Sequence, residues 1–254
     1  MARPPMSDFN RGYARTIPAD RADMSVDAGL RSFMLGVYNK MALGLLLSAA
    51  LAWVTADYAP VQQLLYTVTP DGRLAGFTAA GTVIRFLPLV VLLGAMFIKN
   101  PSPRAAGAIY WSVVAGIGAG LGVWLLAYTG SSVALTFLIT AAAFGGLSLI
   151  GYTTKKDLTG LGSFMMMGLI GLVLASLVGI FWHPPGFSMI ISALGVLIFS
   201  GLIAYDTQNL KMTYYQLGGD KGSMAVATNY GALNLYLNFI NLFQFLLQFT
   251  GSRR

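Results

Sequence analysis

Three long stretches without a charged residue constrain this chain more than any other feature. They lie between Arg104 and Lys155, between Asp157 and Asp206, and between Lys221 and Arg253. Each is longer than the ~20 apolar residues that cross a bilayer as a helix. Only 10% of the residues are charged, against about 25% in soluble domains. The sequence therefore predicts an all-α membrane protein that crosses the bilayer repeatedly.

Turn-forming residues divide the apolar runs into seven expected helices. The breaks are the segments PDG, NPSP, YTGSS, TTKKD and HPPG. The expected crossings are residues 41–55, 82–99, 105–127, 133–152, 162–182, 187–209 and 228–249. An amphipathic stretch at 30–41 is expected to lie along the membrane interface before the first crossing. Residues 1–29 are expected to form a disordered cytoplasmic arm, and residues 30–254 a single seven-helix transmembrane domain.

The distribution of Lys and Arg predicts the orientation. With the N-terminus inside, every Lys and Arg except Arg73, Arg85, Arg253 and Arg254 falls on the cytoplasmic side, as the positive-inside rule requires. We expect Arg85, near the outer start of the second helix, to be an interface anchor.

Composition narrows the possible chemistry. The chain has no cysteine and one histidine, which excludes disulfides and thiolate metal sites. The net charge of +7 does not indicate nucleic-acid binding, because charge in a membrane protein must be interpreted by its position. Ser148 and His183 could suggest an intramembrane protease, but the topology puts them at opposite membrane faces, beyond the contact that the mechanism needs. We expect neither an enzyme nor a cofactor.

Small residues recur at a spacing of four in the third expected helix. Gly116 pairs with Gly120 in this way, and Gly118 with Gly122. The run GIGAGLG lacks the GxGxxG spacing and a preceding strand, so it does not predict a nucleotide site. Such residues permit close contact between helices in lipid.

Asp206, in GLIAYDTQNLK, is an acidic residue within an otherwise charge-free span. Desolvation and the negative end of the helix dipole both disfavour its ionised form there. It is therefore a candidate proton-sensitive group, since ionisable residues within membranes are commonly functional. The alternative is a carboxylate that reaches the headgroups or pairs with Lys211 or a loop lysine.

The last expected helix carries five amides in the segment ALNLYLNFINLFQFLLQF. These are Asn234, Asn238, Asn241, Gln244 and Gln248, which fall within an arc of about 120° on a helix. Such a stripe should face the protein interior or a hydrated cavity, because lipid would leave the amides unpaired. Hydrogen bonding between helices is the alternative, and it is favoured for Gln244 and Gln248. Asn234, Asn238 and Asn241 are candidates for an ion pathway beside Asp206.

The segments GLIAYDTQNLK, ALNLYLNFINLFQFLL and TTKKDL together resemble the signature of the Bax inhibitor (transmembrane Bax-inhibitor-motif) family, from about residue 30 to the C-terminus. The resemblance implies a bundle with the seventh helix central and surrounded by the other six. It also implies a pH-sensitive calcium leak and, from the bacterial-type TTKKDL turn, a place in a bacterial inner membrane.

In family members of that kind, two aspartates on the sixth and seventh helices share a proton and control closure at the cytoplasmic side. Asp206 matches the first, and Asn238 stands where the second belongs. A basic residue near the inner end of the second helix completes the latch, for which Lys99 and Arg104 are the candidates.

The replacement of a carboxylate by Asn238 has physical consequences. An amide removes the repulsion between two carboxylates and can donate a hydrogen bond to ionised Asp206. Asp206 and Asn238 would form only a weak calcium site, since one formal charge is lost while an amide oxygen remains a ligand. We expect weaker calcium affinity and a lower pH midpoint than in members with two aspartates.

A second function remains open. The chain could be a modulator of stress or cell death that transports nothing and binds membrane partners, such as a membrane-bound protease. The polar arm at 1–29 would then be the segment that binds the partner.

Overall fold

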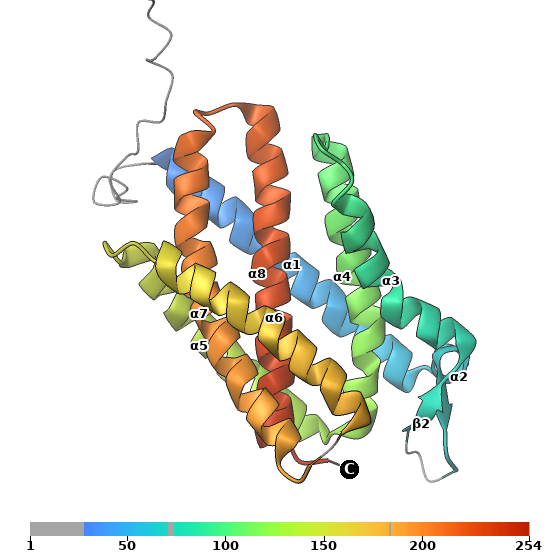
Figure 1. Ribbon diagram of the computed structural model, residues 1–254. Coiled ribbons are helices and arrows are strands. Elements are labelled where there is room, and N and C mark those ends of the chain that lie inside the picture. Colours follow the sequence, from blue (N-terminus) through green and yellow to red (C-terminus); the bar gives the residue numbers. More distant parts are fainter. Residues whose placement is uncertain (1–27, 71–73, 183, 254) are drawn as a thin grey trace, which may run out of the picture.

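The computed structural model describes residues 28–70, 74–182 and 184–253 (Figure 1). The expected arm at 1–29 lies outside them except for its last two residues, which begin α1. The elements are α1 (Ala28–Asp57), α2 (Ala59–Leu65), β1 (Tyr66–Val68), β2 (Leu74–Phe77), α3 (Ala79–Ala95), α4 (Pro103–Ala127), α5 (Gly130–Thr153), α6 (Thr159–Phe181), α7 (Phe187–Gln216) and α8 (Lys221–Thr250).

Helix α8 lies at the centre of the bundle (Figure 1). It packs against α1, α4, α5 and α7, whereas α3 packs mainly on α4 and α6 on α7. Leu235, Tyr236 and Leu247 of α8 are fully buried. The seventh long helix is therefore central, but the expectation that all six others surround it is wrong. Because α3 and α6 form an outer layer, one side of α8 is left open.

A small antiparallel sheet departs from the all-α expectation. Strands β1 and β2 pair Tyr66 with Phe77, whose rings meet edge to face at 5.7 Å. Tyr66 is buried, and its hydroxyl donates to the carbonyl of Ala119 at 3.0 Å. Aromatic and β-branched residues favour this extended pairing. The hairpin thus covers one end of the α1–α4 pair.

Helix α1 is one continuous helix of 30 residues, so the expected interfacial entry at 30–41 is wrong. The apolar side chains of that stretch, among them Leu30, Met34 and Val37, are buried in the bundle. The ring of Phe33 lies 5.7 Å from that of Tyr214 in α7. The amphipathic pattern of this stretch is therefore explained by packing within the protein, because α7 extends far enough to cover the apolar face of α1.

The segment between the expected crossings 187–209 and 228–249 is mostly helical. Helix α7 ends at Gln216 and α8 begins at Lys221. Gly218 and Gly219 take positive φ angles of 58° and 86°, a conformation that suits glycine. Asp220 caps α8, and the backbone N–H of Ser223, which donates at 2.7 Å, holds the pKa of this exposed carboxyl below its ordinary value.

Glycines bring α1 and α4 into close contact. A side chain at Gly118 would overlap Ser48, and one at Gly122 would overlap Thr55. The predicted packing role is therefore confirmed for this pair. Gly116 lies against Pro88 of α3, but Gly120 has open space around the position of a Cβ.

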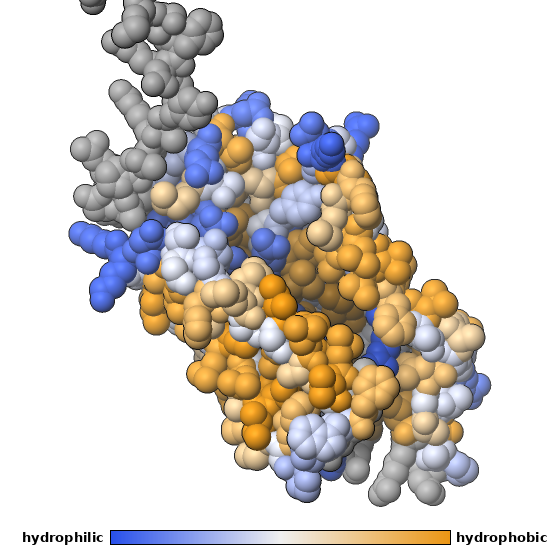
Figure 2. Space-filling view, viewed as in Figure 1, coloured by the Kyte–Doolittle hydropathy of each residue, from blue (hydrophilic) through white to orange (hydrophobic). Residues whose placement is uncertain are grey.

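Among the residues that the structure describes, five helices are long and apolar enough to cross a membrane: α1, α4, α5, α6 and α7. Large apolar side chains are exposed along the outside of the bundle, including Phe86, Leu138, Phe164 and Leu197. Figure 2 shows this apolar surface below a hydrophilic end. The fold is that of a helical membrane protein in contact with lipid.

Candidate functional site

Asp206 and Asn238 meet where α7 and α8 pack together. The side-chain nitrogen Nδ2 of Asn238 donates a hydrogen bond of 2.7 Å to Oδ2 of Asp206. Asn238 is buried and Asp206 is half-buried. The amide thus offers its N–H directly to the carboxylate, the arrangement in which a hydrogen bond gains most from a negative charge.

The residue after Asp206 ties α7 to α5. The hydroxyls of Thr207 and Ser148 are hydrogen-bonded at 3.2 Å, and both residues are buried. Nearby, a side chain at Gly151 would overlap the backbone of Ala204. The α5–α7 contact beside Asp206 is therefore tight. Ser148, considered above as a nucleophile, instead has a packing role, and His183 lies outside the described residues.

Gln208 fastens the TTKKDL turn to α7. Its Oε1 accepts from the backbone N–H of Leu158, and its Nε2 donates to the carbonyl of Lys156, both at 2.8 Å. The turn itself begins α6, since Asp157 accepts from the N–H of Thr159 at 2.8 Å. Two of the recognised segments are thus held together by one buried amide.

Lys211, the alternative partner for Asp206, extends toward α5. Its ammonium donates to the carbonyl of Tyr152 at 2.6 Å and lies 4.8 Å from the centre of that ring. Tyr152 belongs to the last turn of α5, where carbonyls lack helical partners and a cation is favourable. Within the described residues, Asp206 forms its side-chain hydrogen bond with Asn238 and no ion pair.

The amide stripe of α8 faces the open side of the bundle. Asn234 and Gln248 are exposed, and Asn241 and Gln244 are half-buried. Asn241 donates to the carbonyl of Leu237 within its own helix. The opposite face, with residues such as Leu235 and Leu242, is buried. The stripe is thus divided: Asn238 is buried against α7, whereas the other four amides reach the open side of α8. The hydroxyl of Ser192 in α7 donates to Oε1 of Gln248 at 3.4 Å, which is the interhelical hydrogen bond favoured for that residue. Figure 2 shows the surface hollowed between α6 and α3.

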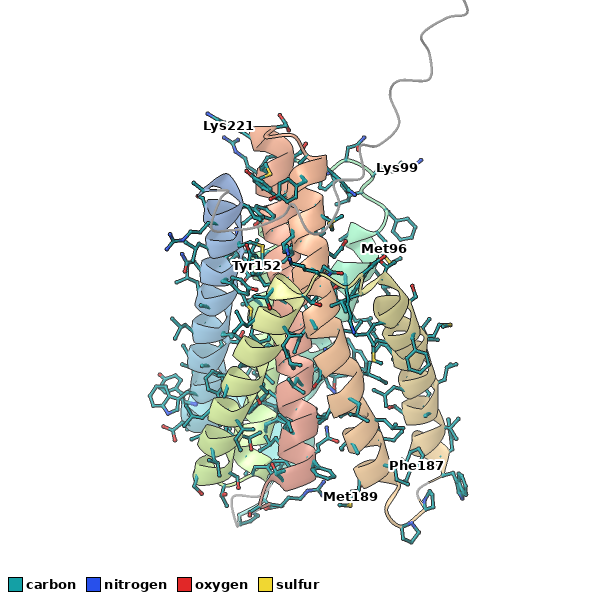
Figure 3. All side chains as sticks on the ribbon, turned by 90° about the vertical axis from the view of Figure 1, so that its left-hand side faces the viewer. Met96, Lys99, Tyr152, Phe187, Met189 and Lys221 are labelled. Carbon is teal, nitrogen blue, oxygen red and sulfur yellow. The ribbon has the colours of Figure 1, made fainter. Side chains whose placement is uncertain are left out.

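Neither candidate latch cation contacts Asp206 in the described structure. Helix α3 ends at Ala95, so Lys99 lies in the exposed turn that follows, and Arg104 is exposed in the first turn of α4. Figure 3 shows Lys99 at the same end of the bundle as Lys221, with Tyr152 below them in the same half. The expected arrangement of a basic residue against Asp206 is not present in this conformation.

Sequence reasoning assigned no role to Gln208 and Asn229, which the structure buries, and considered buried Lys211 only as a partner for Asp206. Asn229 of α8 donates to the carbonyl of Ala225 at 2.8 Å, and its Oδ1 has no hydrogen-bond partner among the described residues. The sequence does hold a signal for Gln208 and Lys211, because both belong to the segment that contains Asp206. Asn229 lies at the start of the expected crossing 228–249, outside the segment whose amides were considered.

Comparison with known proteins supplies the family. The family model described as inhibitor of apoptosis-promoting Bax1 matches residues 30–254. An uncharacterised protein of Caulobacter vibrioides is 66% identical over 250 residues, which cover 98% of this chain and all of the relative. The inner membrane protein YbhL of Escherichia coli K12 is 42% identical over 228 residues, covering 89% and 94% of the two chains. An uncharacterised membrane protein of Streptococcus pyogenes is 37% identical over 226 residues, with the same coverage. The chain is thus a membrane protein that belongs to the Bax inhibitor family.

Proposed function

We propose that this protein is a pH-sensitive cation leak, with calcium as the expected cargo, controlled at the contact between Asp206 and Asn238. The observation that carries the proposal is the 2.7 Å hydrogen bond between a half-buried carboxylate and the amide of the neighbouring helix. That contact lies beside a stripe of amides on the open side of α8. A charge-bearing group next to a polar path is the arrangement expected of an ion route through a bilayer.

The proposed topology has seven crossings with a cytoplasmic N-terminus. Helix α3 has 17 residues, the shortest length that spans a bilayer, and α8 has 30 residues whose amides lower its hydropathy. Together with the five apolar helices they make an odd number of passes. Figure 3 supports this count, since Lys99 and Lys221 lie at one end of the bundle, with Tyr152 below them in the same half, and Phe187 and Met189 lie at the other end. The family relative in Escherichia coli is an inner membrane protein, and we propose the same membrane here.

Asp206 would act by changing its charge. When it is ionised, it accepts the Asn238 hydrogen bond and attracts a cation; when it is protonated, both interactions weaken. Calcium prefers six to eight oxygen ligands, and this pair supplies only carboxylate and amide oxygens from two side chains. So few protein ligands suit a calcium ion that is transported through the protein and keeps most of its water ligands.

A flux assay in liposomes tests the proposal. The purified protein is reconstituted with a calcium-sensitive dye inside the vesicles, and calcium entry is compared with protein-free vesicles. Asn234→Leu should lower the rate, because it replaces an exposed amide of the stripe with an apolar side chain. Gln216→Leu is the matched control, since it removes an exposed amide at the far end of α7. A native rate equal to that of empty vesicles would refute the leak and favour the modulator that transports nothing.

A further inference from the structure

A cavity of about 770 Å³ opens between α3, α4 and α8, at the end of the bundle that carries the β1–β2 hairpin. Its lining is divided along the bundle axis. Arg85 and Arg253 lie at the hairpin end, and Leu92 and Ile117 lie deeper. With a rise of 1.5 Å per residue, Leu92 is about 10 Å further along α3 than Arg85. The cavity therefore combines a cationic mouth with an apolar interior.

Both guanidinium groups rest on aromatic rings of the lining. The Arg85 guanidinium lies 4.9 Å from the ring centre of Phe77, and that of Arg253 lies 5.8 Å from the ring centre of Tyr128. Stacking of this kind orients a guanidinium and leaves its N–H groups available for an anion. None of the described lining residues is acidic. The mouth thus holds two oriented positive charges without a carboxylate among them.

The chain end that carries Arg253 is fastened in place. Tyr128 and Arg253 form an antiparallel bridge, and the N–H of Thr129 donates to the carbonyl of Ser252 at 3.1 Å. The N–H of Ser252 in turn donates to Ser132 Oγ at 3.0 Å. These contacts hold residues 252–253 against the turn between α4 and α5, and so position Arg253 at the mouth.

We propose that this cavity binds an anionic phospholipid, with the phosphate between Arg85 and Arg253 and one acyl chain along the apolar wall formed by Leu92 and Ile117. Charge complementarity favours an anionic lipid over a zwitterionic one, because the cationic group of a zwitterionic headgroup would be repelled by the two arginines. The amides of Gln244 and Gln248, which also line the cavity, supply neutral donors to the glycerol and ester oxygens. Gln244 and Gln248 also belong to the amide stripe of α8, but lipid binding is measured without calcium flux, so its test does not depend on the proposed ion leak.

Native mass spectrometry of the detergent-solubilised protein tests the proposal. The protein is titrated with dioleoyl phosphatidylglycerol and, separately, with dioleoyl phosphatidylcholine. We expect the native chain to prefer the anionic lipid, and Arg85→Gln or Arg253→Gln to weaken its binding about fivefold each. Arg85→Lys should keep the preference. Lys155→Gln, which removes an exposed cation at the opposite end of the bundle, is the control and should change nothing.

A second variant tests the apolar half of the site. Gly120 lines the cavity and has open space at its Cβ position, so Gly120→Leu should fill the interior without disturbing the packing. It should weaken binding of both lipids, while inorganic phosphate in excess should not displace the bound anionic lipid. The proposal is overturned if the native chain binds both lipids equally, if a variant that combines Arg85→Gln with Arg253→Gln keeps the preference, or if phosphate alone displaces the lipid.

Discussion

Substitution of Gln208 tests how the segment GLIAYDTQNLK in α7 is attached to the TTKKDL turn. It is 6% exposed, and its amide makes two hydrogen bonds of 2.8 Å to the backbone of the turn between α5 and α6. Gln208→Ala leaves the N–H of Leu158 and the carbonyl of Lys156 without these partners. Gln208→Met removes the same hydrogen bonds but preserves most of the side-chain volume.

The expected loss of folding stability in Gln208→Ala follows from the two hydrogen bonds that this substitution removes. A net contribution of about 1 kcal/mol each gives a loss of about 2 kcal/mol, which for a chain of this length lowers the melting temperature by about 4–8 °C. Thermal unfolding in detergent, followed by the fluorescence of the four tryptophans, measures the shift. Gln208→Met should show most of it, because packing is a minor part of the effect.

Gln216→Ala is the matched control for this experiment. It removes an exposed glutamine from the last turn of the same helix, and its melting temperature should stay within about 1 °C of the native value, as surface substitutions usually cost little. If Gln208→Ala and Gln216→Ala unfold at the same temperature, the proposed role of Gln208 in fastening the turn is wrong.

Three further predictions concern the site and its supports. Asn238→Asp places a second carboxylate beside Asp206, so like-charge repulsion should raise the pH midpoint of calcium flux in liposomes; an unchanged midpoint would contradict this. Gly151→Leu should destabilise the fold by about 1–3 kcal/mol, because its side chain overlaps the backbone of Ala204. Gly145→Leu is the control, since Gly145 has open space at its Cβ position. Equal melting temperatures for the two variants would refute the close contact. Hydrogen bonds from Thr159 and Ser223 keep the pKa values of Asp157 and Asp220 below the ordinary value. The stability that these caps contribute is therefore fully present above about pH 4 and is lost as the pH falls through the lowered pKa values. Asp220→Asn remains a cap but cannot be protonated in this range, so it should lose less stability on acidification than the native chain. Unfolding measured at pH 3 and at pH 6 tests this.

Charge-free runs and helix breakers were sufficient to predict the long helices, because length and hydropathy dominate folding in a bilayer. The contact between Asp206 and Asn238 also followed from the two recognised segments. The strands at Tyr66–Val68 and Leu74–Phe77 did not, since they are too short to show a clear alternation.

The rest depended on tertiary packing that no local pattern records. The amide arc of α8 was visible in the sequence, but its environment depends on α3 and α6, which lie in an outer layer. Gln208 and Lys211 bind backbone carbonyls and N–H groups of α5 and its following turn. Backbone groups are present in every residue, so the sequence carries no mark of which of them will meet a buried side chain.

The pH profile of calcium flux in Asp206→Asn, measured beside the native protein in the same liposomes, tests the central claim most directly. Asp220→Asn serves as the matched control, because it removes an exposed carboxylate far from Asn238 and retains a helix cap. We expect that flux through the native protein and the control varies with pH through a single titration, and that the Asp206→Asn profile is flat. A profile for Asp206→Asn with the native midpoint would show that Asp206 does not control the leak.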